Sequence, residues 1–168
     1  MIMTGSGRAN YIRDHKLFHH VGDRCMFMFR KLPLYSELIS VGNNVHFASN
    51  VTLVTHDVTH VMLNRSDPSL KLSEYVGCIE IGDNVFIGAN TTILYNVKIP
   101  SNTIIGANSL VNKPLKQGGV YAGIPARYIC SVEDFLKKRA GYTLKIQKNK
   151  SRLTPETVKD AWKLFHGL

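Results

Sequence analysis

The chain has 168 residues, of which 44% are hydrophobic and 20% charged, a composition typical of one folded domain and not of a disordered chain. Its formal charge is +9, but no basic stretch is interleaved with aromatic side chains, so we expect no nucleic-acid partner. No apolar run approaches the roughly 18 residues of a membrane span, and residues 1–10 lack the apolar core of a signal peptide. We therefore expect a cytoplasmic protein without a membrane span.

The first part of the chain, residues 1–24, shows no repeat and is expected to form an arm or a short helix, the helix falling within residues 8–20. The next segment, from Met26 to Leu38, is rich in apolar residues and contains Pro33. We interpret this segment as a first, irregular coil of the structure that the following repeats predict.

A six-residue period starts at Val41 and organises most of the chain. One position in six is apolar, namely Val41, Phe47, Leu53, Ile81, Ile87, Ile93, Ile99, Ile105 and Val111. Three positions after the apolar residue, Asn recurs at Asn44, Asn50, Asn84, Asn90, Asn96, Asn102 and Asn108. Asn tolerates left-handed backbone and bonds its own backbone, so these positions are predicted to be corners.

A period of six fits neither an α-helix, whose period is 3.6, nor the two-residue alternation of a half-solvated strand. It predicts short strands joined by corners, three to a coil, wound into a mainly β structure, a parallel β-helix, over residues 25–129 with the apolar row inside. The period breaks between Leu53 and Ile81. Residues 59–77, which are polar and include Asp67-Pro68-Ser69, are therefore predicted to be a loop extruded from the coil, a common place for a functional lid.

The pattern changes again in residues 130–168, which predict a C-terminal α-helical extension. A helix is expected from about Val132 to Arg139, and a second one begins at Thr154-Pro155 with a capping Thr and a Pro at the first helical position. Helical spacing then gives a stripe formed by Val158, Ala161, Trp162 and Phe165. We interpret the stripe as a packing surface.

His56 is the departure from the repeat that carries chemical information. It occupies the slot in which Asn usually stands, immediately before the extruded loop. A neutral imidazole is the usual group for removing a proton from a hydroxyl near neutral pH, and Asp57 or Thr55 lies near enough in sequence to orient the ring. A corner His without a catalytic role is the alternative that the sequence leaves open.

The stretch Thr55-His56-Asp57, the coils on either side and the ending Gly123-Ile124-Pro125-Ala126-Arg127 resemble the hexapeptide-repeat acyltransferases, notably the maltose and galactoside O-acetyltransferases and the xenobiotic (streptogramin) acetyltransferases. The resemblance covers roughly residues 25–129. It implies a left-handed parallel β-helix, a homotrimer with active sites between subunits, and acetyl-CoA as the donor substrate. In that comparison His56 matches the general base.

The resemblance also implies a path for acetyl-CoA. Ala89, Gly106 and Ala107 match small positions beside the pantetheine arm, although each of them is also an ordinary repeat residue. Asn112 and Lys113 match a pair near the nucleotide, and Arg127 matches a basic residue near the 3′-phosphate; solvated surface charge is the alternative for Lys113 and Arg127. The residues that we expect to line the acceptor pocket are Tyr35, Asn50, Asp57 and Phe86.

The function expected from these features is acetyl transfer from acetyl-CoA to a hydroxyl of a sugar or a surface polysaccharide. Acetylation of a streptogramin-type antibiotic is the alternative within the same chemistry, and a β-helix scaffold is the alternative without catalysis. A three-His zinc site of the γ-type carbonic anhydrases is not expected, because no His occurs between Gly77 and Tyr128. We therefore expect no metal.

Overall fold

The computed structural model describes residues 3–149 and 152–167. The chain divides into two compact units, Met1–Val132 and Glu133–Leu168, each of which is described by itself. No helix in the described part of the chain is both long enough and apolar enough to cross a membrane.

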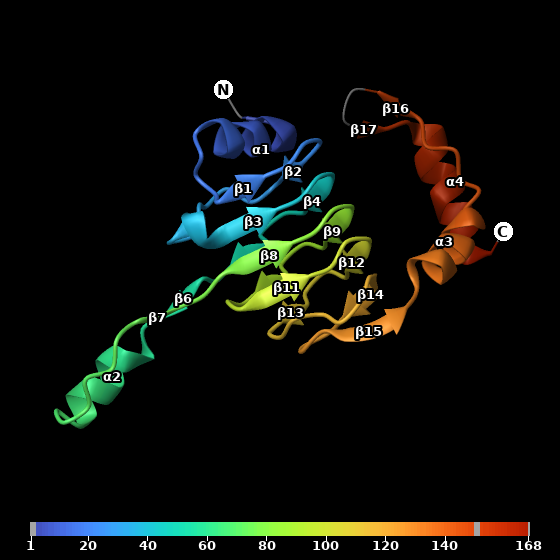
Figure 1. Ribbon diagram of the computed structural model, residues 1–168. Helices are drawn as coiled ribbons and strands as arrows, with labels where there is room; N and C mark the ends of the chain where they lie inside the picture. Colours follow the sequence, from blue (N-terminus) through green and yellow to red (C-terminus); the bar gives the residue numbers. More distant parts are fainter. Residues whose placement is uncertain (1–2, 150–151, 168) are drawn as a thin grey trace. The chain divides into compact units, whose positions relative to one another are not determined.

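The first unit consists mainly of three sheets that the chain visits in turn (Figure 1). Sheet A contains β1 (His20–Val21), β3 (Ile39–Val41), β8 (Ile79–Ile81) and β11 (Val97–Ile99). Sheet B contains β2 (Met26–Phe27), β4 (Val45–Phe47), β9 (Val85–Ile87), β12 (Thr103–Ile105), β14 (Gly119–Ala122) and β15 (Arg127–Cys130). Sheet C contains β5 (Thr52–Leu53), β10 (Thr92–Ile93) and β13 (Leu110–Val111). All strand pairs in these sheets are parallel except β14 with β15, so the predicted mainly β coil of short strands is confirmed.

The strand register explains the six-residue period. Ile79 of β8 pairs with Val97 of β11, and Val85 of β9 pairs with Thr103 of β12, so one coil takes 18 residues and three repeats. The apolar row lies inside, as predicted: each of its nine members is at most 6% exposed. Stacked apolar side chains in a dry interior supply the main stabilisation of the coil.

The corners are built as the sequence predicts. All seven Asn residues of the repeat have left-handed backbone, with φ between 54° and 59°. Their side chains also join neighbouring coils, since Asn44 donates to Asn84 at 3.0 Å and Asn84 donates to Asn102 at 3.2 Å. Asn therefore has two roles: its backbone adopts the left-handed conformation of the corner, and its side chain extends a ladder of hydrogen bonds along the stack.

The extruded segment is more ordered than the loop that the sequence predicts for residues 59–77. Leu53 pairs with Ile93, 40 residues away instead of 18, so 22 residues are inserted into this coil. The inserted residues form an antiparallel pair, β6 (His56–Asp57) with β7 (Tyr75–Val76), and the helix α2 (Thr59–Ser66), which projects away from the stacked coils (Figure 1). The helix was missed because its apolar residues, Val61, Met62 and Leu63, are consecutive and do not have helical spacing. The Asp57 carboxylate accepts the backbone N–H of Thr59 at its start.

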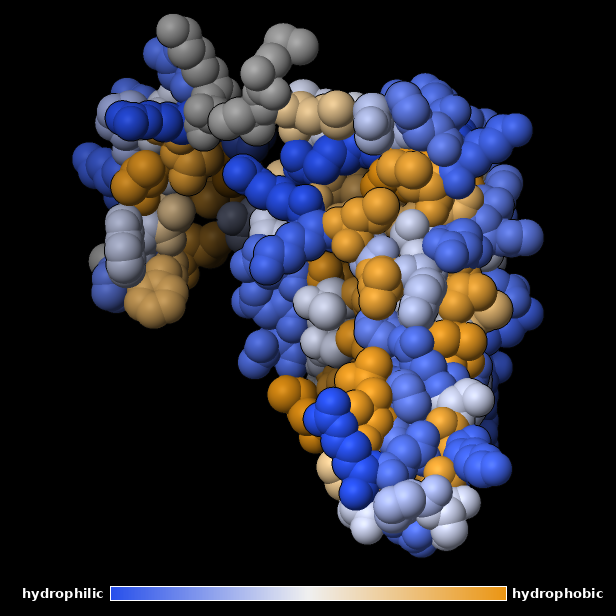
Figure 2. Space-filling view, turned by 90° about the vertical axis from the view of Figure 1, so that its left-hand side faces the viewer, coloured by the Kyte–Doolittle hydropathy of each residue, from blue (hydrophilic) through white to orange (hydrophobic). Residues whose placement is uncertain are grey.

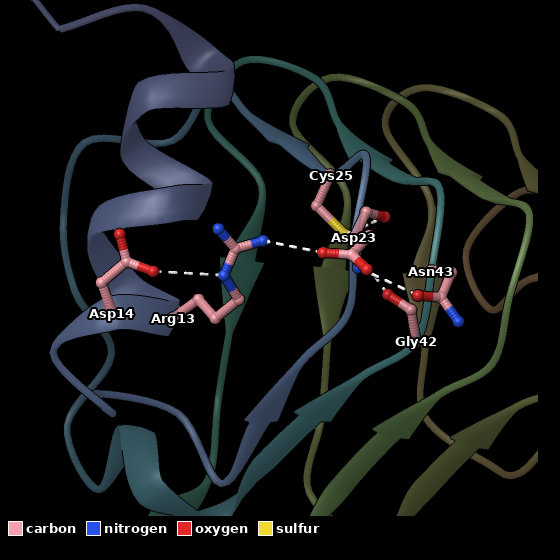
Figure 3. A network of polar contacts seen from close by, with 6 residues as sticks. All are labelled: Arg13, Asp14, Asp23, Cys25, Gly42 and Asn43. Atoms are coloured by element: carbon pink, nitrogen blue, oxygen red, sulfur yellow. Dashed lines mark hydrogen bonds and ion pairs between the residues drawn. The ribbon is translucent and has the colours of Figure 1, made fainter.

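The N-terminal helix α1 (Gly5–Asp14) covers the end of the stack at β1 and β2 (Figure 1). It begins earlier than the expected 8–20, because the Thr4 side chain accepts the N–H of Gly7 and caps it. β1 then falls within the segment expected to be an arm or helix. Figure 3 shows how the helix is fastened: Arg13 is ion-paired with Asp23 of the first coil at 3.0 Å.

The second unit contains α3 (Val132–Ala140), the antiparallel strands β16 (Lys148–Asn149) and β17 (Arg152–Leu153), and α4 (Pro155–His166). Both predicted helices are confirmed, including the Thr154 cap and Pro at the start of α4. The interpretation of the α4 stripe as a packing surface is wrong within this chain for Val158, Trp162 and Phe165, which are 41%, 59% and 76% exposed. Helical spacing indicates that a face is apolar but not that something covers it.

Candidate active site

His56 lies at the root of the extruded segment, in the short strand β6. It pairs with Val76 of β7, and its backbone is not in the left-handed region. The expectation that His56 forms a corner of the coil is therefore wrong. Because Leu53 is in register with Ile93, the counterpart of His56 in the next coil is Asn96, and there the corner does form. The chain leaves the coil at His56 instead of turning.

The imidazole of His56 is half-buried and incompletely bonded. Its Nδ1 atom is buried without a hydrogen-bond partner. Its Nε2 atom is not buried and has no hydrogen bond within the described chain. The ring of Tyr35 stands edge-on against it, with ring centroids 5.4 Å apart. A His with an accessible nitrogen in a packed setting can exchange a proton with a bound molecule.

Tyr35 is itself held by the extruded segment. Its hydroxyl donates to Oε2 of Glu74 at 3.0 Å, and this hydrogen bond, followed by burial, raises the pKa of Tyr35. The hydroxyl of Tyr35 therefore stays protonated, and its hydrogen bond fixes the ring beside His56. Thr55, which the sequence offers as a partner for the ring, instead donates its hydroxyl to the backbone oxygen of Leu34.

Asp57 fastens the root of the extruded segment to the next coil. One carboxylate oxygen accepts the hydroxyl of Thr59 at 2.7 Å and the other accepts the hydroxyl of Tyr95 at 2.7 Å. The hydrogen bonds from Thr59 and from Tyr95 lower the pKa of Asp57. The bond between Tyr95 and Asp57 also raises the pKa of Tyr95. The opposite strand is fastened too, because Asn96 donates to the hydroxyl of Tyr75 at 2.8 Å. We call these contacts the clasp.

A second group of expected site residues lies around one cavity near the last coils. Asn112, Lys113 and Arg127 line this cavity of about 410 Å³ together with Lys116. All four side chains are exposed, and none of the three cations is ion-paired within the described chain. The structure thus brings together the three residues expected at the nucleotide end, and it adds Lys116, which the repeat pattern gave no reason to select.

The small residues expected along the pantetheine path lie on a different corner, where sheet B passes into sheet C. Ala89 and Ala107 occupy equivalent places in adjacent coils, and the backbone N–H of Asn108 donates to the backbone oxygen of Ala89 at 2.7 Å. A Cβ added to Gly88 would lie 2.4 Å from the backbone nitrogen of Ala107. Coil stacking alone therefore requires a glycine at Gly88, next to Ala89, whereas Ala107 is exposed.

The expected acceptor residues are not all brought together. Tyr35 and Asp57 lie beside His56, but Asn50 lies on the corner between sheets B and C, and Phe86 lies on the outer side of β9. Phe86 is 45% exposed. On the face of the molecule that Figure 2 shows, apolar side chains lie in separate patches among hydrophilic ones. Sheet C separates Asn50 from His56 in a single chain.

Sequence reasoning missed Glu74 and Tyr95. Aligning the repeats on either side of the insertion places Thr55 beside Tyr95, so a comparison across the break would have pointed to that neighbour. Nothing in the sequence indicates the contact between Glu74 and Tyr35. Among the described residues, no cluster of three or more His, Cys, Asp or Glu side chains has the arrangement of a metal site.

Comparison with known proteins identifies the family. Residues 78–113 match the bacterial transferase hexapeptide family (six repeats). The chain is 34% identical over 140 residues to a putative acetyltransferase, YvoF, of Bacillus subtilis (strain 168), covering 80% of this chain and 74% of that protein. It is 34% identical over 116 residues to the galactoside O-acetyltransferase of Escherichia coli (strain K12), covering 68% of this chain but 55% of that enzyme.

Among solved structures, the chain is similar to the maltose O-acetyltransferase of Clostridium difficile 630, with a TM-score of 0.55 and 28% identity over 70% of this chain and 71% of that one. The sequence relatives, the repeat and the fold agree. This chain belongs to the hexapeptide-repeat acetyltransferase family and is an acyltransferase.

Proposed function

We propose that the protein is an O-acetyltransferase that moves an acetyl group from acetyl-CoA to a hydroxyl of a sugar or a surface polysaccharide, with His56 as the general base. The observation that carries the proposal is the accessible Nε2 of His56 beside the clasp, in a chain of this family. The similarity to a galactoside and a maltose O-acetyltransferase supports a sugar acceptor. The proposal places the reaction in the cytoplasm.

The chemistry requires one proton transfer at His56. The acceptor hydroxyl attacks the thioester carbonyl while Nε2 takes its proton, and collapse of the tetrahedral intermediate releases the acetyl ester and the CoA thiolate, which accepts that proton. Backbone N–H groups would stabilise the oxyanion. In this scheme Tyr35 and Asp57 hold His56 and the root of the extruded segment in place, because their polar atoms already have partners within the chain.

The donor is proposed to lie along the coils. Lys113, Lys116 and Arg127 offer three cations to the phosphates of acetyl-CoA at the 410 Å³ cavity, and Asn112 offers an amide beside them. The pantetheine arm would then pass Ala89, Gly106 and Ala107, where the absence of larger side chains permits close approach to the backbone. These residues suit a ligand that is anionic at one end and thin along its length.

We infer a homotrimer, because within one chain His56 is separated from the residues proposed to lie along the pantetheine arm. His56 lies where the chain leaves sheet C, whereas Ala89 and Ala107 lie where it passes from sheet B into sheet C. Left-handed prisms packed side by side would place His56 of one subunit against Ala89 and Ala107 of its neighbour. Exposed apolar side chains on sheet B, such as Phe86 and Tyr128, each 45% exposed, suit such a contact.

The test is an acceptor panel. The purified protein is incubated with acetyl-CoA and free sugars, nucleotide sugars, oligosaccharides or a streptogramin, and mass spectrometry detects a product heavier by one acetyl group. The proposal predicts acetylation of a carbohydrate that depends on His56. Acetylation of the streptogramin alone would replace the sugar by the antibiotic, and a protein that binds no acetyl-CoA and acetylates nothing would favour the scaffold.

A further inference from the structure

A basic cavity lies where α1 meets the first two coils. It consists of two pockets of about 630 and 610 Å³, here called its lobes, which share the lining residues Arg8, Phe29, Arg30 and Lys31. The first lobe is completed by residues of the coils, namely Met28, Ser49, Asn50, Val51 and Thr52. The second is completed by Met3, Tyr11, Ile12, Leu17 and Leu32. Neither lobe is lined by an Asp or a Glu, so the cavity presents three positive charges without a counter-charge.

Arg8 is fixed in the cavity wall without being neutralised. Its Nε donates to the backbone oxygen of Phe27 at 2.7 Å, and its Nη1 donates to the backbone oxygen of Met3 at 2.7 Å. Carbonyl oxygens orient a guanidinium but carry no net charge, and an Arg has five N–H donors, so donors remain free. Arg13 on the same helix differs, because Asp14 and Asp23 neutralise it (Figure 3).

Arg30 and Lys31 follow the first coil and are both exposed. Neither side chain has an ion pair or a hydrogen bond within the described chain. Lys98 differs, because it is paired with Glu80 at 2.8 Å. Three neighbouring cations repel one another, and a concave wall concentrates their field, so an anion that enters this space is attracted by all three.

The rest of the wall suits a sugar. Tyr11 and Phe29 both line the cavity. Tyr11 is 46% exposed, with its ring stacked on that of His15 at a centroid distance of 4.0 Å, and Phe29 is buried at 5% exposure. Ser49, Asn50 and Thr52 offer hydroxyl and amide groups that can bond to hydroxyls. Apolar and aromatic walls with a few polar groups are the usual composition of a small-molecule site.

We propose that the basic cavity binds an anionic carbohydrate, a sugar that carries a phosphate or a carboxylate. Arg8 and Arg30 supply planar guanidinium groups that match the paired oxygens of either anion, and Lys31 adds a point charge. The sugar ring lies against Tyr11 and the polar edge of the second coil. Neither His56 nor the residues proposed to hold acetyl-CoA line this cavity, whereas Asn50, one of the expected acceptor residues, does. The proposal concerns binding alone and is tested without acetyl-CoA.

The experiment is calorimetric titration of the full chain, in the absence of acetyl-CoA, with glucose 1-phosphate, glucuronate and uncharged glucose. At least one anionic sugar is expected to bind 10-fold or more tightly than glucose, and its affinity should fall as salt is added. A preference for glucose 1-phosphate or for glucuronate identifies the anion. Equal binding of glucose, or no binding of either anionic sugar at low salt, overturns the proposal.

The variant Arg30→Gln/Lys31→Gln is expected to weaken binding of the anionic sugar at least 10-fold. Its matched control, Lys138→Gln/Lys148→Gln, removes the same charge from the second unit and should leave the dissociation constant within twofold. Equal losses in both variants would assign the effect to net charge and contradict the site. Arg8→Lys keeps the charge but removes the planar guanidinium. It is expected to weaken binding of the anionic sugar severalfold while its melting temperature matches that of the parent chain.

The two proposals are separable. His56→Ala should bind the anionic sugar as the parent chain does, whatever it does to acetyl transfer. A loss of sugar binding in His56→Ala with unchanged melting temperature would place the sugar at His56 and contradict the basic cavity.

Discussion

Asn96 and His56 occupy the same place in successive coils, but the chain forms a corner only at Asn96. At Asn96 the backbone turns left-handed with φ of 56°, and the chain continues into β11. At His56 the chain leaves the coil for 22 additional residues, and the antiparallel pair of β6 and β7 replaces the corner.

The difference separates the contacts that hold the scaffold from those that hold the proposed general base. The regular coils are held by an interior row that is repeated and redundant, and each Asn extends a ladder. The interrupted corner is held by hydrogen bonds that Thr59 and Tyr95 donate to the Asp57 carboxylate. A change in the regular coils should therefore affect stability, whereas a change at the interrupted corner should affect turnover.

The largest effect is expected from His56→Ala. Loss of a general base should lower turnover by about 10²–10⁴-fold, while folding and acetyl-CoA binding are retained. Initial rates and the melting temperature measure the two effects. His19→Ala, which removes an exposed His near β1, is the control and should leave turnover unchanged. Near-normal turnover of His56→Ala would remove His56 from the mechanism.

The corresponding change in the regular coils is Ile93→Asn. Ile93 is 0% exposed in sheet C, and the variant loses apolar packing and buries an amide without a partner. Together these effects should cost about 2–5 kcal/mol of unfolding free energy. Leu94→Asn, at the next and partly exposed position, should cost much less in the same denaturant titration. Equal stabilities would contradict the inward row.

A smaller effect is expected at a regular corner. Asn84 has φ of 56°, and Asn84→Ala should cost about 1–2 kcal/mol because Ala tolerates left-handed backbone poorly. Asn84→Gly removes the same ladder contact but permits the backbone, so it should cost less. If both variants lose the same amount, the ladder and not the backbone is what Asn contributes.

The smallest effect is the pH dependence carried by Asp57. Because hydrogen bonds from Thr59 and Tyr95 lower its pKa in the folded chain, the stabilisation is present above the unfolded pKa and is lost as pH falls through the folded value. Asp57→Asn should therefore differ from the parent chain most at neutral pH and least in acid, as chemical unfolding from pH 7 to pH 3 would show.

Asp67 is the matched control for Asp57. Its pKa is also lowered, by hydrogen bonds from Ser69, but its partners lie within the extruded segment. Asp67→Asn should show a similar pH dependence of stability without changing turnover, whereas Asp57→Asn should reduce turnover as well. Equal turnover in both variants would mean that the clasp does not position His56.

The repeat made the coil predictable because each slot has one physical requirement, apolar inside or left-handed at a corner. Ile93 and Asn96 could therefore be placed from spacing alone. The helix α2 and the contact of Glu74 with Tyr35 could not, because the 22-residue insertion breaks the spacing and the contact joins residues 39 positions apart. His56 could be selected as a departure from the repeat, but its strand conformation depends on a partner, Val76, that the repeat does not specify.

The central claim is that acetyl-CoA is the donor, and thermal unfolding with and without acetyl-CoA tests it most directly, with free adenine nucleotides as controls. At about 100 times its dissociation constant, a ligand that binds only the folded chain stabilises it by about 2.7 kcal/mol. We predict a clear upward shift of the melting temperature with acetyl-CoA that exceeds the shift with the nucleotides. No shift at millimolar acetyl-CoA would contradict the proposed donor and with it the proposed reaction.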